Sequence, residues 1–322
     1  MIVAKNNQGD FDSVQAAIDS IPSSNTTWCT IYIKNGVYKE KIHITSPYIR
    51  LIGESADKTI ITYDDYAYKL FPTGESYGTF NSYTMFVGTS DFHAENLCIE
   101  NSSGIGDKVG QAIAAYVDGD RVCFKNCRFI GYQDTLFTGP LPPKPIVPGS
   151  FRGPRENAPR INGRQYYENC YIQGDIDFIF GSATAFFYSC TIFSNDIGKK
   201  VNGYITAPST PEGQAYGYVF EDCKITSHCP KHTVYLGRPW RHFAKSVFIN
   251  CDLGAHIIPA GWHNWDKPDS EKVNFFGEYN NKGPGYTPTE RVNWSHLLSD
   301  IEAKHYSRQN VLNGSDNWTP WS

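Results

Sequence analysis

Apolar residues at every second position recur along most of the chain, and one six-residue unit marks each recurrence. The unit is an apolar residue, any residue, then Asn, Ser or Asp, then Cys, any residue and a second apolar residue. It occupies segments 124–129, 167–172, 187–192, 220–225 and 248–253, and a looser copy lies at 94–99. The period of two and the many aromatic residues predict that each unit is a β-strand rather than a helix.

The repetition indicates how these strands pack. Successive full units lie 20 to 43 residues apart, and each is too small to bury its apolar side alone. Such repeats become stable when they stack into a solenoid whose coils share one core. We therefore predict an all-β protein, a right-handed parallel β-helix, in which loops of different length leave equivalent strands. Its long flat face suits the binding of a polymer.

The segments outside the repeats predict capping elements and one large loop. Apolar residues at helical spacing between Asp10 and Pro22 predict a helix that covers the first coil. Residues 139–160 contain seven Pro in 22 positions and should project as a loop, because Pro cannot continue a sheet. The other predicted elements are strands at 30–33 and 48–52, a helix at 294–306, and a tail to Ser322 that packs along the side.

Composition narrows the classes of partner. The net charge is −4 and no run of Lys and Arg occurs, which argues against nucleic acid. No stretch is long and apolar enough for a membrane span. Residues 1–5 lack the basic and apolar regions of a signal peptide. We expect one domain over residues 1–322 and a monomer, cytoplasmic if Met1 is native or secreted if a signal has been removed.

The nine Cys residues are expected to serve packing. Five of them occupy the same place in successive units, where stacked thiols behave as small buried hydrophobic groups. An occasional disulfide is the alternative. Cys123 and Cys127 are expected to lie on one strand without converging on an ion. No Cys or His spacing matches a metal site, so we expect neither a metal nor another cofactor.

Four short strings place polar side chains among aromatic and glycine residues: GQAIA at 110–114, GYQDTL at 131–136, DFIFG at 177–181 and LGRPW at 236–240. An Asp in an apolar strand needs a partner, because a buried unpaired carboxylate is costly. Arg238 is the expected partner that holds Asp177 ionised, while Asp134 lies near that charge and keeps its proton longer. Two carboxylates in unequal environments can divide the roles of nucleophile and acid.

These strings, in this order within β-helix repeats, resemble the pectin methylesterase (pectinesterase) family over nearly the whole chain. With its Pro-rich insertion the chain looks like a bacterial-type member. The resemblance implies hydrolysis of C6 methyl esters of pectin or methylated oligogalacturonides to methanol and acid. It implies Asp177 as nucleophile, Asp134 as general acid and then base, Gln111 and Gln133 as oxyanion donors, and Arg238 as the partner of Asp177.

Substrate contacts are less sharply indicated. By family role Trp240 is a platform for a sugar ring, and weaker candidates, for which packing is nearly as good an explanation, are Tyr132, Phe180, Phe137, Trp262 and Trp265. In the Pro-rich loop, Lys144, Arg152 and Arg155 are expected to form a cationic rim facing demethylated carboxylates. The loop is therefore predicted to form one wall of the groove.

Some alternatives stay open at this point. Asp175 precedes Asp177 by two residues and on a regular strand would share its face, so it is a rival nucleophile. The two Gln side chains could satisfy strand ends instead, and Arg238 could brace a loop. The alternative functions are a β-helix polygalacturonase or pectate lyase that cuts the backbone, and a carbohydrate-binding solenoid without activity.

Overall fold

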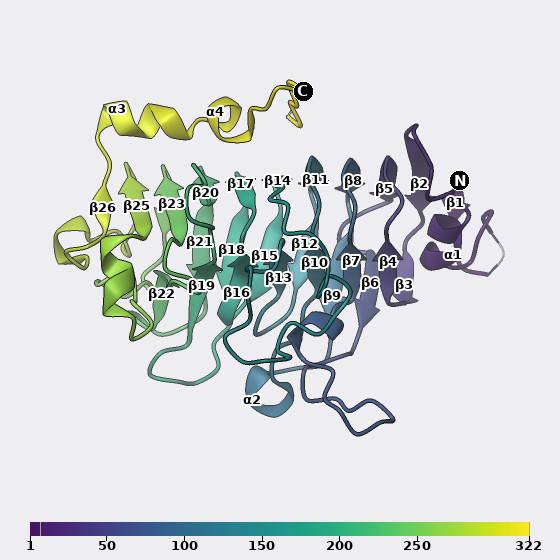
Figure 1. Ribbon diagram of the computed structural model, residues 1–322, viewed down its shortest axis with the longest axis horizontal. Helices are drawn as coiled ribbons and strands as arrows, with labels where there is room; N and C mark the ends of the chain where they lie inside the picture. Colours follow the sequence, from purple (N-terminus) through teal and green to yellow (C-terminus); the bar gives the residue numbers. More distant parts are fainter. Residues whose placement is uncertain (7, 322) are drawn as a thin grey trace.

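The computed structural model describes residues 1–6 and 8–321. It is a right-handed parallel β-helix, seen from the side in Figure 1, with its coils running from the N-terminal end in purple to the C-terminal end in green and yellow. The strands pair in parallel between successive coils and form three sheets along the molecule. The prediction of an all-β solenoid is confirmed.

The first sheet carries the repeats and runs the length of the molecule. Within the described residues its strands, in spatial order, are β1 (Ile2–Val3), β2 (Cys29–Ile33), β5 (Ile49–Gly53), β8 (Phe92–Glu95), β11 (Val122–Lys125), β14 (Arg164–Glu168), β17 (Thr184–Tyr188), β20 (Tyr218–Glu221), β23 (Lys245–Ile249), β25 (Phe275–Tyr279) and β26 (His296–Leu297). The strands expected at 30–33 and 48–52 are β2 and β5.

The other two sheets complete each coil. The second sheet consists of β22 (Val234–Gly237), β19 (Gly203–Pro208), β16 (Ile176–Gly181), β13 (Leu136–Thr138), β10 (Ala115–Val117), β7 (Met85–Val87) and β4 (Ile42–Ile44). The third consists of β24 (Asp252–Leu253), β21 (Lys224–Ser227), β18 (Thr191–Ser194), β15 (Tyr171–Gly174), β12 (Arg128–Ile130), β9 (Cys98–Asn101), β6 (Thr59–Tyr63) and β3 (Gly36–Lys39).

The repeated unit is a corner between two strands, so the prediction of one strand per unit is wrong. In the unit at 124–129, β11 ends at Lys125 and β12 begins at Arg128. Asn126 between them has a φ of 51°, a left-handed conformation that Asn and Asp tolerate better than most residues. The Asn, Ser or Asp of every other unit has a φ between 51° and 55°. Cys123 therefore lies on β11, whereas Cys127 lies in the corner just before β12.

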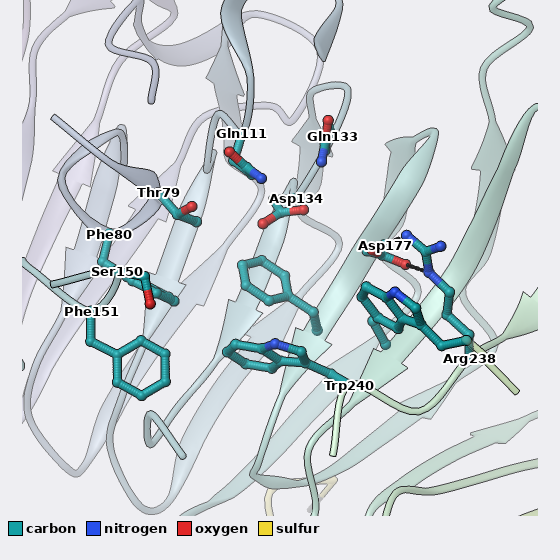
Figure 2. A pocket seen from close by; sticks show the side chains of 13 residues that line it. Thr79, Phe80, Gln111, Gln133, Asp134, Ser150, Phe151, Asp177, Arg238 and Trp240 are labelled. Carbon is teal, nitrogen blue, oxygen red and sulfur yellow. Dashed lines mark hydrogen bonds and ion pairs between the residues drawn. The ribbon is translucent and has the colours of Figure 1, made fainter. Parts of the chain in front are cut away.

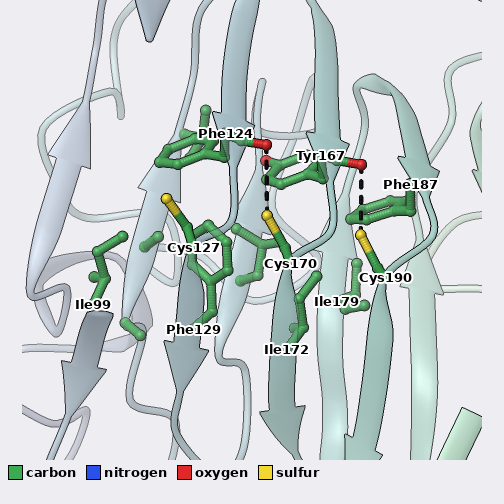
Figure 3. Packing of buried hydrophobic residues seen from close by; sticks show 14 of the residues in the cluster. Ile99, Phe124, Cys127, Phe129, Tyr167, Cys170, Ile172, Ile179, Phe187 and Cys190 are labelled. Carbon is green, nitrogen blue, oxygen red and sulfur yellow. Dashed lines mark hydrogen bonds between the residues drawn. The ribbon is translucent and has the colours of Figure 1, made fainter. Parts of the chain in front are cut away.

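Aromatic rings and thiols form columns through the core. Rings at 124, 167, 187, 220 and 248 stack with centroids 4.4 to 5.4 Å apart and planes within 11° of parallel. Next to them the Cys170 and Cys190 sulfurs each lie 3.5 Å from a backbone carbonyl oxygen of a preceding coil, at Phe124 and Tyr167 (Figure 3). The equivalent cysteines are buried packing residues, as predicted.

Thiol titration tests this packing. All nine Cys are free thiols, seven of them buried and two, Cys29 and Cys229, half-buried. Only the half-buried pair is expected to react with a thiol reagent in the native protein, and all nine should react after unfolding without a reductant. Fewer than nine reactive thiols in the unfolded protein would mean that some of them are paired in solution.

The capping elements are shorter than predicted. The helix over the first coil is α1 (Val14–Asp19), which begins where the Ser13 side chain accepts a hydrogen bond from the Ala16 amide. The helix expected at 294–306 does not form as one element, because Ser299 and Glu302 make a capping box that starts a helix only there. Instead the chain forms β26, α3 (Asp300–Ala303), η4 (Lys304–Tyr306) and α4 (Arg308–Leu312).

The C-terminal segment runs back along the first sheet, as Figure 1 shows in yellow. Trp321 packs edge-on to Tyr166 on β14 at 6.0 Å between centroids, which confirms the predicted path of the tail, although Ser322 lies outside the described residues. The remaining short helices are α2 (Gly106–Val109), η1 (Thr79–Asn81), η2 (Pro268–Lys272) and η3 (Pro288–Glu290). Among the described residues no helix has the length and apolar character to traverse a bilayer.

Candidate active site

The four polar strings meet on the outer side of the second sheet. Gln111 precedes β10, Gln133 and Asp134 precede β13, Asp177 lies in β16, and Arg238 directly follows β22. These strands are close neighbours in that sheet, so residues up to 127 positions apart converge. All five side chains line one cavity of about 260 Å³ (Figure 2).

Asp134 and Asp177 both have a left-handed backbone conformation, which determines where their carboxyl groups point. Asp134 has a φ of 66° and Asp177 a φ of 53°, a conformation that costs about 1–2 kcal/mol for a residue with a side chain. The amide of Asp134 donates to the carbonyl of Ile176, 3.1 Å away, and β16 shifts register against β19 between Ile176 and Ile179. This irregularity joins the two Asp positions and places both side chains at the cavity.

The same irregularity separates Asp175 from Asp177. Asp175 would share a face with Asp177 only on a regular strand, and the bulge breaks that alternation. Its side chain is 1% exposed, and its Oδ1 accepts a hydrogen bond from the Ile176 amide at 2.6 Å. Asp175 does not line the cavity.

Arg238 holds Asp177 in a two-pronged ion pair. Its Nε donates to Oδ1 at 2.8 Å and its Nη2 donates to Oδ2 at 2.7 Å. The guanidinium lies between the rings of Tyr204 and Trp265, with its carbon 3.7 Å from each ring centroid. A bidentate pair inside an aromatic clamp fixes the orientation of the carboxylate as well as its charge.

The two carboxyl groups differ in their electrostatics. Burial raises the pKa of Asp177, while the charge and hydrogen bonds of Arg238 act against this rise. Burial also raises the pKa of Asp134 well above its usual range, and the neighbouring charge of Asp177 raises it further. Of these two carboxyl groups Arg238 hydrogen-bonds to Asp177, so the arrangement favours an ionised Asp177 beside a protonated Asp134.

The two Gln side chains stand above the carboxyl groups. Figure 2 shows the amide nitrogens of Gln111 and Gln133 directed toward Asp134. The Gln133 Oε1 lies against the backbone of Gly106, where an added Cβ would come within 2.5 Å of it. This contact directs the amide N–H groups of Gln133 toward the cavity, where they can stabilise negative charge on a bound oxygen.

The predicted aromatic contacts divide into two groups. Trp240 and Phe180 line the cavity and pack edge-on to each other at 5.8 Å. The predictions for Tyr132, Phe137 and Trp262 are not supported, because none of them lines it. Phe137 is fully buried beneath it, and Trp262 is a core residue, 1% exposed, that stacks on an inner Phe ring.

Several lining residues carried no usable signal in the sequence. Thr79 and Phe80 belong to η1, and Ser150 and Phe151 belong to the Pro-rich loop. Trp265, which lies between β24 and η2, was in contrast one of the weaker aromatic candidates, and it lines the cavity. The short helix and the loop are irregular, so neither gives a periodic pattern that would point a particular side chain at the site.

The Pro-rich loop reaches the cavity, but its charges differ from the prediction. The ring of Phe151 packs against Phe80 and Trp240 at the wall of the site. The expected cationic rim is absent among the described residues, since Arg152 pairs with Glu75 at 3.0 Å and Arg155 pairs with the buried Asp118 at 2.8 Å. Lys144 does not line the cavity.

A family model and a curated relative to which this chain is similar both carry the name pectinesterase. The family model described as Pectinesterase matches residues 1–140 and 157–315. Pectinesterase 31 of Arabidopsis thaliana is 36% identical over 326 residues, which cover 99% of this chain and 93% of that protein.

Two solved structures with a similar fold are pectin methylesterases. A pectin methylesterase in complex with a hexasaccharide has a TM-score of 0.82 and 31% identity, covering 99% of this chain and 97% of its own. Pectin methylesterase from carrot has a TM-score of 0.81 and 28% identity, covering 97% and 92%.

Proposed function

Since this chain belongs to the pectinesterase family, we propose that it hydrolyses the C6 methyl esters of pectin to methanol and free carboxyl groups. The observation that carries the proposal is the pairing of Asp177 with Arg238 at 2.7 and 2.8 Å beside a second, buried carboxyl, Asp134. Gln111 and Gln133 line the same cavity. The similar pectin methylesterase structure with a bound hexasaccharide supports a substrate made of several linked sugar residues.

In the first step the Asp177 carboxylate attacks the ester carbonyl carbon. The carbonyl electrons move onto oxygen, and the resulting oxyanion accepts hydrogen bonds from the amides of Gln111 and Gln133. Neutral donors suit this task, because a cation in their place would also neutralise the nucleophile. Arg238 keeps the attacking carboxylate ionised and aimed at the substrate.

In the second step the intermediate collapses and methanol leaves. Methoxide is a poor leaving group, so protonated Asp134 donates its proton to the methoxy oxygen as the bond to carbon breaks. The products are methanol, ionised Asp134 and an anhydride between Asp177 and the substrate acyl group.

In the third step water restores the enzyme. Asp134 takes one proton from a water molecule that attacks the anhydride, which releases the uronic acid and returns Asp177 as a carboxylate. The new acid ionises beside the Asp177 carboxylate, and repulsion between these like charges favours its departure.

A product assay tests this function against backbone cleavage. Nothing in the comparisons or in the site favours a polygalacturonase or a pectate lyase. With highly methylated pectin as substrate, we expect methanol to appear without new reducing ends or unsaturated ends. Reducing ends in proportion to time would identify a glycosidase, unsaturated ends a lyase, and no product at all a binding protein.

Chelation is expected to leave methanol release unchanged, because each step above uses only carboxyl, amide and guanidinium groups. Among the described residues no three His, Cys, Asp or Glu side chains form a group that could hold an ion. The measurement is the initial rate of methanol release after dialysis against EDTA, with and without added Ca²⁺. A loss with EDTA that Ca²⁺ restores would contradict the mechanism.

A further inference from the structure

The Pro-rich loop builds a second cavity beside the first. Residues 141–156 fall outside the two segments that match the family model, so this wall is an addition to the shared fold. The second cavity measures about 510 Å³. It is lined on the loop side by Val147 to Ser150 and Arg152, and on the other side by Ala67, Tyr68, Ser76 to Thr79 and Gln111.

The two cavities are continuous. Thr79, Gln111 and Ser150 line both of them, so they form the shared boundary. Gln111 is one of the two oxyanion donors proposed above. A polymer with one residue at Asp177 can therefore place another residue of the same chain in the second cavity.

The walls of the second cavity combine apolar and polar side chains and carry an exposed ring. Tyr68 is 61% exposed and Val147 is 64% exposed, and Pro148 lies beside Val147. The Tyr68 ring lies against Gly110, where an added Cβ would come within 2.8 Å of a ring carbon. An amphipathic ring that lines the same cavity as an aliphatic surface suits the carbon-bound face of a sugar.

The charge in this cavity is already balanced. The Arg152 guanidinium pairs with Glu75 at 3.0 Å, and the carbonyl of Arg152 accepts a hydrogen bond from the Asn81 side chain at 3.1 Å. A carboxylate entering here would have to compete with Glu75 and would lose water against apolar walls, which is costly for an ion. A neutral ester meets neither obstacle.

We propose that the loop forms a subsite for a methyl-esterified galacturonate residue, on the same polymer chain as the ester being hydrolysed. This inference rests on the proposed function and specifies which methylation pattern of the substrate the protein prefers. The protein then favours substrates with several methyl esters in one stretch and acts less well next to residues that are already demethylated. That preference is the opposite of the one a cationic rim would give.

A charge placed in the loop tests the subsite. The experiment compares kcat/KM for fully methylated hexagalacturonate with that for methylated trigalacturonate, in wild type, Val147→Asp and Ile146→Asp. Ile146 is the matched control, because it is the preceding loop residue, is 70% exposed and lines neither cavity. Tyr68→Ala is a second test variant, with Tyr32→Ala as its control, since Tyr32 is 51% exposed on β2.

The expected result is a lower ratio of hexamer to trimer kcat/KM in the test variants. Recognition of one small apolar group is worth about tenfold, so Val147→Asp and Tyr68→Ala should each lower the ratio by about that factor. Ile146→Asp and Tyr32→Ala should keep the wild-type ratio. Test variants that keep the wild-type ratio, or controls that lose it equally, would overturn the subsite.

Two further results separate the possible failures. If wild type releases no methanol from either substrate, the proposed function itself is wrong, and this shows before any variant is compared. If Arg152→Gln lowers kcat/KM for a partly demethylated hexamer more than for the fully methylated one, the cavity binds a carboxylate and the inference is wrong. Equal effects of Arg152→Gln on both hexamers support the neutral occupant.

Discussion

Replacing Asp177 by Asn is expected to lower methanol release from methylated pectin by about a thousandfold or more. The amide keeps the shape of the side chain and can still accept a hydrogen bond from Arg238, but it cannot form the anhydride. The melting temperature should therefore change by only a few degrees. Initial rates of methanol release, with circular dichroism and a melting curve on the same samples, measure both effects.

Asp175→Asn is the matched control for this variant. Asp175 is a buried carboxyl two residues away, and burial raises its pKa to about 6. It lines no part of the cavity, so its replacement should cost far less activity than that of Asp177. An active Asp177→Asn together with an inactive Asp175→Asn would show that the nucleophile has been misassigned.

Replacing Arg238 by Gln is expected to give the second largest effect, a loss of about a hundredfold in kcat/KM at neutral pH. The guanidinium opposes the rise in the pKa of Asp177 that burial causes, so its removal raises that pKa further. The nucleophile acts as a carboxylate, above its pKa. The acid limb of the pH–rate profile should therefore move to higher pH in the variant.

The profile of kcat/KM against pH measures this shift. Arg238→Lys is the control, because it keeps the positive charge but not the bidentate geometry. It should show a smaller shift and an intermediate rate. An acid limb at the same pH in wild type and Arg238→Gln would mean that Arg238 does not control the ionisation of the nucleophile. Its role would then be to hold the loop after β22 in place.

The sequence was sufficient to predict the principal groups of the site. A carboxyl group in an apolar strand needs a partner, which pointed from Asp177 to Arg238, and the structure brings them within 2.7 Å. The stacked Cys positions were also predictable, because equivalent residues of a solenoid share one environment. The corner inside each unit was missed because apolar residues continue to alternate on both sides of it.

Other features depend on geometry that a single sequence does not carry. Trp240 lines the cavity while Trp262 stacks in the core, and only the paths of the turns after β22 and after β24 separate these two residues of the same type. The positive charges of Arg152 and Arg155 suggested a cationic rim. Their partners, Glu75 and Asp118, lie in earlier coils and are brought to the loop only by stacking.

The bulge in β16 is a further feature that could not be predicted from the sequence. Period-two reasoning placed Asp175 and Asp177 on one face, whereas the left-handed φ of 53° at Asp177 turns its side chain toward the cavity. Strain of this kind cannot be inferred from residue types alone, and it occurs where the surrounding structure imposes it. Here it coincides with the register shift of β16 between Ile176 and Ile179.

The division of roles between Asp177 and Asp134 is the central claim, and an activated aryl ester of an oligogalacturonate tests it most directly. Its phenolate leaves without a proton, so Asp134→Asn should still form the anhydride but then stall, because no base activates water. We predict a burst of about one phenolate per molecule of Asp134→Asn, followed by slow turnover, and no burst from Asp177→Asn. A burst from Asp177→Asn, or none from Asp134→Asn with an intact fold, would contradict the account.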